Sequence, residues 1–132
     1  MNNTDSPVAA IPLIETFPGS PAHDLFGSAS GADEVEIFCS LWLDFCGTLI
    51  PRLEALGSFT DVELLRSELH TLRGMSAQFG LFLLEIYFFA WEKKTSDPVV
   101  ATPRFLPGAL IIATRSLDAM ESAFPFLHSS AA

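Results

Sequence analysis

Apolar residues recur at three- and four-residue steps along most of the chain from Asp33 onward, which is the spacing of amphipathic α-helices. In the first such segment they occupy positions 35, 38, 41, 42, 45, 49, 53 and 56, and Gly57 and Ser58 end the segment. No stretch alternates apolar and polar residues for long enough to predict a β-strand. The pattern therefore predicts an all-α fold.

The second predicted helix begins where a capping signal precedes a new apolar stripe. Thr60 and Glu63 have the three-residue spacing of a capping box, which marks the start of a helix. The glycine at position 80 predicts a tight bend at the end of this helix. The residues of its core-facing stripe are Val62, Leu65, Leu69, Leu72, Ser76 and Phe79.

Two further helices follow the bend. The segment 81–94 is apolar on nearly all sides, so we expect it to be the most buried helix, and residues 96–98 to close it. The last helix is predicted to start at Thr102 and Pro103 or at Pro107, because proline is favoured in the first turn of a helix, and to run to about Ala123.

Four amphipathic helices joined by short links predict an antiparallel four-helix bundle, here over residues 31–124. Prolines, serines and glycines are frequent in residues 1–30, which predicts a mostly irregular N-terminal tail with room for a short helix around 22–26. Residues 125–132 are predicted to form a C-terminal tail. A chain of 132 residues fits a single domain of this size.

Composition and charge restrict the partners and the compartment. The chain carries 16 acidic and 7 basic residues, a net charge of −9, which disfavours nucleic acid and anionic lipid as partners. Mean hydropathy is +0.37, yet no window offers the roughly 18–20 uncharged apolar residues that a membrane-spanning helix needs. No secretory signal is evident, and Cys39 and Cys46 lie too far apart on one helix to pair. We therefore expect a cytoplasmic protein with reduced thiols.

One histidine is set in an unusual surrounding. On a helical wheel at about 100° per residue, His70 falls on the solvent side of the second helix, outside the apolar stripe. Arg66 and Arg73 lie between it and the core edge, one turn before and one turn after. The small residues Gly74 and Ala77 lie on the same side and leave the surface open. Two of the seven basic residues of an acidic chain thus flank this imidazole.

These residue types suit a nucleophile that must hold a phosphoryl group. Neutral imidazole is a good nucleophile at physiological pH, and once phosphorylated it carries about two negative charges. The guanidinium of Arg73 can stabilise those charges without titrating. Gly74 costs about 1 kcal/mol of helix propensity relative to alanine, which indicates that another molecule approaches the backbone there.

The run from His70 to Gly80, HTLRGMSAQFG, resembles the motif of histidine-containing phosphotransfer (HPt) domains. That motif reads His-x-x-Lys-Gly, then small residues, then a hydrophobic residue followed by Gly. Residues 45–69 are similar to the helix and loop that precede it in the family, and the resemblance covers roughly residues 33–122. The chain departs from the family pattern at Arg73, where lysine is usual, and at Met75, where a small residue is usual.

The resemblance implies a four-helix bundle that relays phosphoryl groups between aspartates of response-regulator receiver domains, often from a hybrid sensor histidine kinase. His70 would take the phosphoryl group on Nε2, and the receiver would supply Mg²⁺, so no cofactor or metal site of the chain's own is expected. Family members place a polar residue against the histidine, and Glu92 matches that position. His70 lies ten residues before Gly80 and Glu92 twelve after it, about 15 and 18 Å along antiparallel helices, so the two should be nearly level. A carboxylate there would accept the Nδ1 proton and leave Nε2 free to attack.

Simpler interpretations stand beside these. His70 is an ordinary surface histidine on one of them, Arg66 pairs with Glu63 or the loop, and Gly74 allows close helix packing. An HPt-fold adaptor that binds a receiver or kinase without relaying phosphate is the main alternative function. A self-contained enzyme would need a second catalytic cluster, and the sequence contains none. His23 and His128 have no partner ligands at metal-binding spacing.

Overall fold

The computed structural model describes residues 13–14 and 32–124. In this part of the chain all regular structure is helical: α2 (Ala32–Ala55), a short 3₁₀ helix η3 (Leu56–Ser58), α3 (Val62–Gln78), α4 (Phe82–Lys94) and α5 (Pro98–Ala123). The predicted all-α class with four main helices is confirmed for the described residues. The predictions for segment 1–30, with its short helix over 22–26, and for 125–132 lie outside these residues, apart from Leu13 and Ile14.

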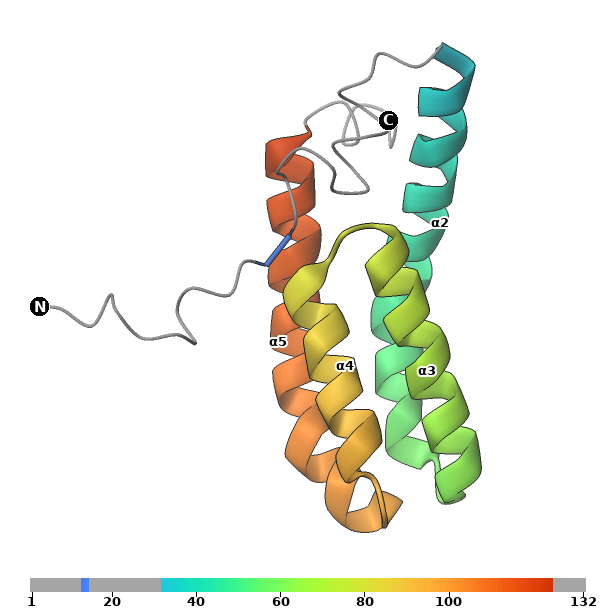
Figure 1. The fold of residues 1–132 in the computed structure, drawn as a ribbon, viewed down its shortest axis with the longest axis vertical. Coiled ribbons are helices and arrows are strands. Elements are labelled where there is room, and N and C mark those ends of the chain that lie inside the picture. The colour runs from blue at the N-terminus through green and yellow to red at the C-terminus, as the bar shows by residue number, and fades with distance from the viewer. Residues whose placement is uncertain (1–12, 15–31, 125–132) are drawn as a thin grey trace, which may run out of the picture.

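The four helices lie side by side along the longest axis of the molecule (Figure 1). The α2–α3 and α4–α5 connections lie at one end of the molecule, and the α3–α4 turn lies toward the other end, where α2 and α5 continue beyond it. α4 packs between α3 and α5, and α5 also packs on α2. At the α3–α4 end, the Leu83 amide donates to the Leu13 carbonyl at 3.4 Å, and Ile14 packs against the core.

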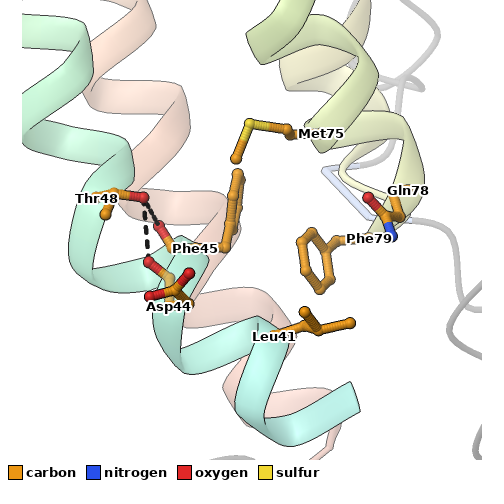
Figure 2. A pocket seen from close by; sticks show the side chains of 7 residues that line it. All are labelled: Leu41, Asp44, Phe45, Thr48, Met75, Gln78 and Phe79. Atoms are coloured by element: carbon orange, nitrogen blue, oxygen red, sulfur yellow. Dashed lines mark hydrogen bonds between the residues drawn. The ribbon is translucent and has the colours of Figure 1, made fainter. Parts of the chain in front are cut away.

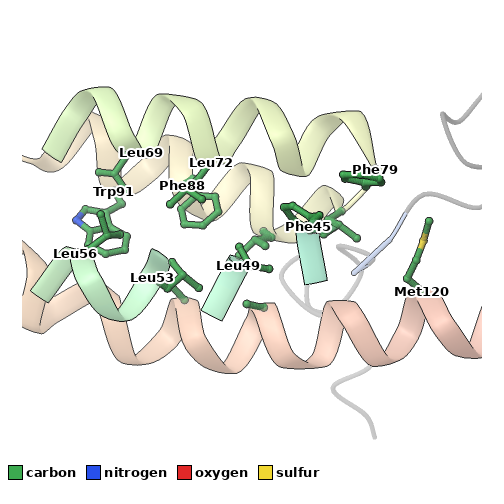
Figure 3. Close-up of a cluster of buried hydrophobic side chains, with 14 of the residues drawn as sticks. Phe45, Leu49, Leu53, Leu56, Leu69, Leu72, Phe79, Phe88, Trp91 and Met120 are labelled. Atoms are coloured by element: carbon green, nitrogen blue, oxygen red, sulfur yellow. The ribbon is translucent and has the colours of Figure 1, made fainter. Parts of the chain in front are cut away.

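Aromatic and leucine side chains of α2, α3 and α4 fill the space between the helices, and α5 contributes buried alanines and Met120 (Figure 3). The ring of Phe79, at the end of α3, is central to the aromatic part. Its centroid lies 5.3 Å from that of Phe38, 5.4 Å from that of Trp42 and 4.8 Å from that of Phe45. Every residue of the predicted α3 stripe is buried except Val62, which is half-buried.

α4 is buried or half-buried along most of its length, as its apolar sequence predicts. Its exposed residues are Ile86, Phe89, Lys93 and Lys94. The indole of Trp91 stacks on the ring of Phe105 from α5, with centroids 5.8 Å apart. The Tyr87 hydroxyl donates to the Phe105 carbonyl at 2.9 Å. These contacts hold α4 against α5, while α4 also packs against α3.

The predicted capping box at Thr60 and Glu63 is wrong by one residue. Asp61 is the N-cap of α3, and its Oδ1 accepts from the amides of Glu63 at 2.8 Å and Leu64 at 3.1 Å. A carboxylate in this position accepts hydrogen bonds from two free amides, and its negative charge interacts favourably with the positive end of the helix dipole. Asp61 is therefore a stronger cap than the threonine hydroxyl before it.

The predicted start of the last helix, at Thr102–Pro103 or Pro107, is also wrong. α5 begins at Pro98, where Asp97 is the N-cap and accepts from the Val99 amide at 3.0 Å. An Asp-Pro pair combines a cap with a residue preset for the first turn. Pro103 and Pro107 lie inside the helix and are exposed, so water can satisfy the carbonyls that lose their partners there. Residues 95–97 thus link α4 to α5, and Pro98, which was expected to help close α4, is the first residue of α5.

The bend predicted at Gly80 is confirmed and has a defined geometry. Gly80 has φ 74°, in the left-handed region that glycine adopts without strain. The Leu81 amide donates to the Ser76 carbonyl at 2.9 Å, and the Gly80 amide donates to the Ala77 carbonyl at 3.1 Å. This pair of bonds is a Schellman motif, which ends α3 and sets the direction of α4.

Candidate functional site

His70 lies in the middle of α3 with its side chain 66% exposed, on the solvent side that the wheel predicts. The turn at Gly80 brings α4 alongside, so that Glu92 lies across from the imidazole. The Glu92 Oε2 atom is 3.6 Å from Nδ1 of His70. The expected proximity of these two residues is therefore present in the structure.

Arg73 joins the other members of this cluster. Its Nη2 lies 3.0 Å from Nδ1 of His70, and its Nε lies 3.7 Å from Oε1 of Glu92. The guanidinium also stands over the ring of Phe89, 4.9 Å from the centroid, which is a cation–π distance. Arg73 thus contacts the imidazole, the carboxylate and an aromatic face at once.

Phe89 and Lys93 belong to this site, and the sequence patterns above do not identify them. The Lys93 ammonium lies 4.9 Å from the Phe89 centroid, so the ring has two cations against it. Phe89 is 42% exposed on a helix that is otherwise largely buried. Its position one turn before Glu92 is the signal that could have revealed it, since residues three apart share a helix face.

Glu92 is only partly solvated. Its side chain is 24% exposed, and Oε1 is buried and makes no hydrogen bond to any described residue. At 3.6 Å, Oε2 is too far from Nδ1 for a good hydrogen bond. The carboxylate is therefore close to the imidazole without being bonded to it, while Arg73 makes the short contact.

Arg66 is not part of the cluster. Its Nη2 donates to the Thr95 carbonyl at 2.8 Å, and its Nη1 lies 3.7 Å from Oε2 of Glu63. These are the partners expected of a structural arginine that ties α3 to the end of α4. The simpler interpretation of Arg66 is the one that the structure supports.

The backbone beside His70 is open. Gly74 is exposed, and a Cβ atom built on it would meet nothing within 4 Å among the described residues. Close helix packing therefore does not account for this glycine in the described structure. Ala77, on the same side of α3, is half-buried. A partner could approach the α3 backbone here without displacing any described side chain.

A cavity of about 130 Å³ lies between α2 and the C-terminal part of α3 (Figure 2). Aromatic rings form part of its wall, and polar groups of α2 and α3 lie around them. The Thr48 hydroxyl donates to the carbonyls of Asp44 at 3.1 Å and Phe45 at 3.3 Å, so it is already satisfied. The lining residues are Leu41, Asp44, Phe45, Thr48, Met75, Gln78 and Phe79.

An ion pair between Arg52 and Glu68 joins α2 to α3, and the sequence patterns above do not identify it. Arg52 donates from Nε to Oε2 of Glu68 at 2.9 Å and from Nη2 to Oε1 at 2.8 Å. Its Nη1 lies 3.1 Å from Sδ of Met75. The hydrogen bonds to Glu68 raise the pKa of Arg52. The pair lies 16 residues apart in sequence, so no local pattern reveals it.

Other candidate chemistries find no support in the described residues. They contain no group of three or more His, Cys, Asp or Glu side chains arranged to hold a metal ion. None of their helices is both long and apolar enough to cross a membrane. Cys39 and Cys46 are free thiols, and burial, followed by the charge of Glu121, raises the pKa of Cys46 to about 12.

Neither a protein-family model, nor a curated protein, nor a solved structure matches the chain. The features that bear on function are therefore the geometry around His70 and the residue pattern of α3.

Proposed function

We propose that this chain is a histidine phosphotransfer protein that relays a phosphoryl group between receiver-domain aspartates through His70. The single observation that carries the proposal is the cluster on α3 and α4: an exposed imidazole with Arg73 at 3.0 Å and Glu92 at 3.6 Å. On this proposal the four helices form an antiparallel HPt-like bundle over residues 31–124.

The contacts of the imidazole favour Nε2 as the phosphorylated atom. Among the described residues, the contacts with Arg73 and Glu92 are made by Nδ1, on the inner edge of the ring. The side chain is 66% exposed, which allows a partner to reach the outer edge. Because Nη2 of Arg73 lies 3.0 Å from the imidazole, a change of its rotamer would bring the guanidinium to a phosphoryl group on His70. There it would offset the new negative charge.

The chain is a phosphocarrier on this proposal and not a self-contained enzyme. The receiver domain supplies the acidic pocket, the Mg²⁺ ion and the aspartate, while this protein supplies the nucleophile and the cation beside it. Gly74 and Ala77 offer the receiver a close approach to α3. The net charge of −9 disfavours nucleic acid as a partner, and the proposal places the protein in the cytoplasm, where receivers and kinases act.

An HPt-fold adaptor that binds a receiver or kinase without relaying phosphate is the second candidate. The observation that favours it is the contact of Arg73 with Nδ1 of His70, since arginine replaces the usual lysine and occupies the nitrogen that Glu92 would otherwise bind. Both candidates predict binding of a receiver, and only the first predicts a phosphorylated histidine.

The deciding experiment incubates the full chain with a panel of purified receiver domains that carry a labelled aspartyl phosphate. We expect label on this protein that is lost in acid and retained in base, as a phosphoramidate requires. His70→Gln should abolish the label, while the matched variants His23→Gln and His128→Gln should retain it. Binding of a receiver without label would select the adaptor, and label that survives in His70→Gln would exclude the site.

Docking is tested separately with Gly74→Gln. The long side chain should weaken receiver binding at least tenfold by calorimetry, because it covers the open backbone beside His70. The circular dichroism spectrum should stay helical, since the position faces away from the described core. Unchanged affinity would show that the receiver does not approach Gly74.

A further inference from the structure

The short contact between Arg73 and His70 fixes where the imidazole carries its proton. A guanidinium has only N–H donors, so the Nδ1 atom at 3.0 Å from Nη2 must accept with its lone pair. In a neutral ring one nitrogen donates and the other accepts. The proton of His70 is therefore on Nε2 in this arrangement.

Glu92 demands the opposite tautomer at the same nitrogen. A carboxylate accepts hydrogen bonds, so Oε2 can bind Nδ1 only when Nδ1 carries the proton. The two atoms lie 3.6 Å apart in the structure, while Oε1 is buried without a hydrogen bond to any described residue. Arg73 and Glu92 thus compete for one atom, and each selects a different form of the ring.

The form that Arg73 selects cannot attack through Nε2. Attack needs a lone pair in the plane of the ring, and a nitrogen that carries a proton has none to offer. The form that Glu92 selects has this lone pair on Nε2. Arg73 contacts both His70 and Glu92. The position of its guanidinium therefore determines which tautomer of His70 is favoured.

We propose that Arg73 is a positioning residue that holds His70 in the unreactive Nε2–H tautomer until an arriving phosphoryl group draws its guanidinium away from Nδ1. This inference rests on the proposed function and adds a control of the same site. Phe89 keeps the guanidinium close during the exchange, because its exposed ring lies 4.9 Å away. Glu92, whose Oε2 lies 3.6 Å from Nδ1, then moves closer and accepts from Nδ1–H.

The transfer step balances in protons and charge. Water takes the proton from Nε2 and returns one to Nδ1 after Arg73 leaves. The Nε2 lone pair then forms the N–P bond as the P–O bond to the receiver aspartate breaks, and the aspartate carboxylate leaves with the electron pair. The ring becomes a phosphorylated imidazolium whose Nδ1–H faces the Glu92 carboxylate, and Arg73 contacts the phosphoryl oxygens.

The test measures the tautomer in the unphosphorylated full chain. Ring nitrogens of ¹⁵N-labelled protein are observed by long-range ¹H–¹⁵N correlation at alkaline pH, where imidazole rings are neutral, and His70→Gln assigns the signals. We expect Nδ1 of His70 to be unprotonated in the wild type. Arg73→Met, which keeps the length and removes the donors, should shift the tautomer ratio roughly tenfold or more toward Nδ1–H.

Glu92→Met is the matched control, because it removes the carboxylate and leaves the Arg73 contact in place. Its ring should stay in the Nε2–H form. A protonated Nδ1 in the wild type, or an Arg73→Met ratio equal to that of the wild type, would overturn the inference. The readout does not involve phosphate, so failure of His70 to take label from any receiver would remove the proposed function and leave this result standing.

Discussion

Two glycines, Gly74 of α3 and Gly108 of α5, lie inside helices but have opposite surroundings. A Cβ atom on Gly74 of α3 would meet no atom of the described residues within 4 Å. A Cβ atom on Gly108 of α5 would overlap the hydroxyl of Tyr87, which donates to the Phe105 carbonyl. Gly108 is therefore required by the packing of α4 on α5, while Gly74 is not required by any described contact.

Alanine at the two positions should accordingly change stability in opposite directions. Gly74→Ala should raise the free energy of unfolding by about 0.5–1 kcal/mol through helix propensity. Gly108→Ala gains the same propensity but forces Tyr87 aside, at a cost of about 1–3 kcal/mol, so the net effect should be destabilising. Urea unfolding measures both. Adding Tyr87→Phe to Gly108→Ala should recover part of the loss, and equal effects of the two single variants would contradict this interpretation.

Cys46 illustrates how burial controls a single thiol. Its pKa is raised to about 12, first by burial and then by the charge of Glu121, so the folded protein keeps the proton well above the ordinary thiol pKa of 9.0. The thiolate is the reactive form of cysteine. Cys46 should therefore react slowly with Ellman's reagent at pH 8 in the native chain.

The same shift gives stability a dependence on pH with a definite sign. The unfolded chain loses the Cys46 proton near pH 9 and the folded chain only near pH 12, so the folded state binds more protons between these values. The contribution of Cys46 to the free energy of unfolding should thus fall as pH rises through this window. Cys46→Ala should lose less stability than the wild type from pH 8 to pH 10.5. In urea both cysteines should react rapidly at pH 8, and equal native and unfolded rates for Cys46 would contradict the assignment.

At the scale of elements, the turn between α3 and α4 depends on one backbone conformation. Gly80 has φ 74°, which costs a residue with a Cβ roughly 1–2 kcal/mol. Gly80→Ala should therefore lower the free energy of unfolding by about this amount in urea titrations. Gly80→Asn is the matched variant and should lose less, because asparagine tolerates the left-handed region. Identical losses for the two variants would indicate that the backbone conformation is not the cause.

The helices themselves could be predicted from sequence, as could the starts of α2 and α4 to within one residue, but the N-caps of α3 and α5 could not. The apolar stripe from Leu65 to Phe79 consists of several residues, so the helix is predicted correctly even if one of them is misassigned. A cap is one side chain, and Asp61 competes with the neighbouring Thr60 for the same amides. At α5 the pair Asp97 and Pro98 follows the apolar run of α4 so closely that it resembles the end of that helix, yet Asp97 caps the first turn of α5 and Pro98 begins it.

Only part of the site could be predicted from sequence: His70, Arg73 and Glu92 were expected, whereas Phe89, Lys93 and the contacts among these residues were not. The exposure of His70 follows from its position on the helical wheel of α3. The nearness of Glu92 follows from the similar numbers of residues that separate His70 and Glu92 from the turn at Gly80. The place of the Arg73 guanidinium does not follow, because a long side chain chooses among His70, Glu92 and Phe89 by local geometry. Long-range pairs such as Arg52 with Glu68 are invisible to periodicity for the same reason.

At the scale of the whole molecule, the ring of Phe79 joins α3 to three aromatic residues of α2. It is 4% exposed, at the end of a helix that otherwise packs mainly on α4. Phe79→Ala should lower the free energy of unfolding by about 3–5 kcal/mol, a large part of the roughly 5–15 kcal/mol typical of a domain. Cooperative urea unfolding with a lower midpoint is the expected measurement.

Phe89→Ala is the control for this prediction, since Phe89 is 42% exposed and contacts cations on the surface. We expect it to cost less than about 1 kcal/mol. Comparable losses at the two positions would show that the α2–α3 aromatic cluster does not hold the helices together.

The Schellman turn at Gly80 also fixes the number of residues between His70 and Glu92 that keeps the two side chains level. One inserted residue between the turn and Glu92 would rotate the carboxylate by about 100° around the axis of α4 and shift it by about 1.5 Å. Single insertions or deletions in either arm therefore separate the pair even where the fold tolerates them. In an alignment of true relatives that share this site, gaps should be absent from the 22 positions that follow His70.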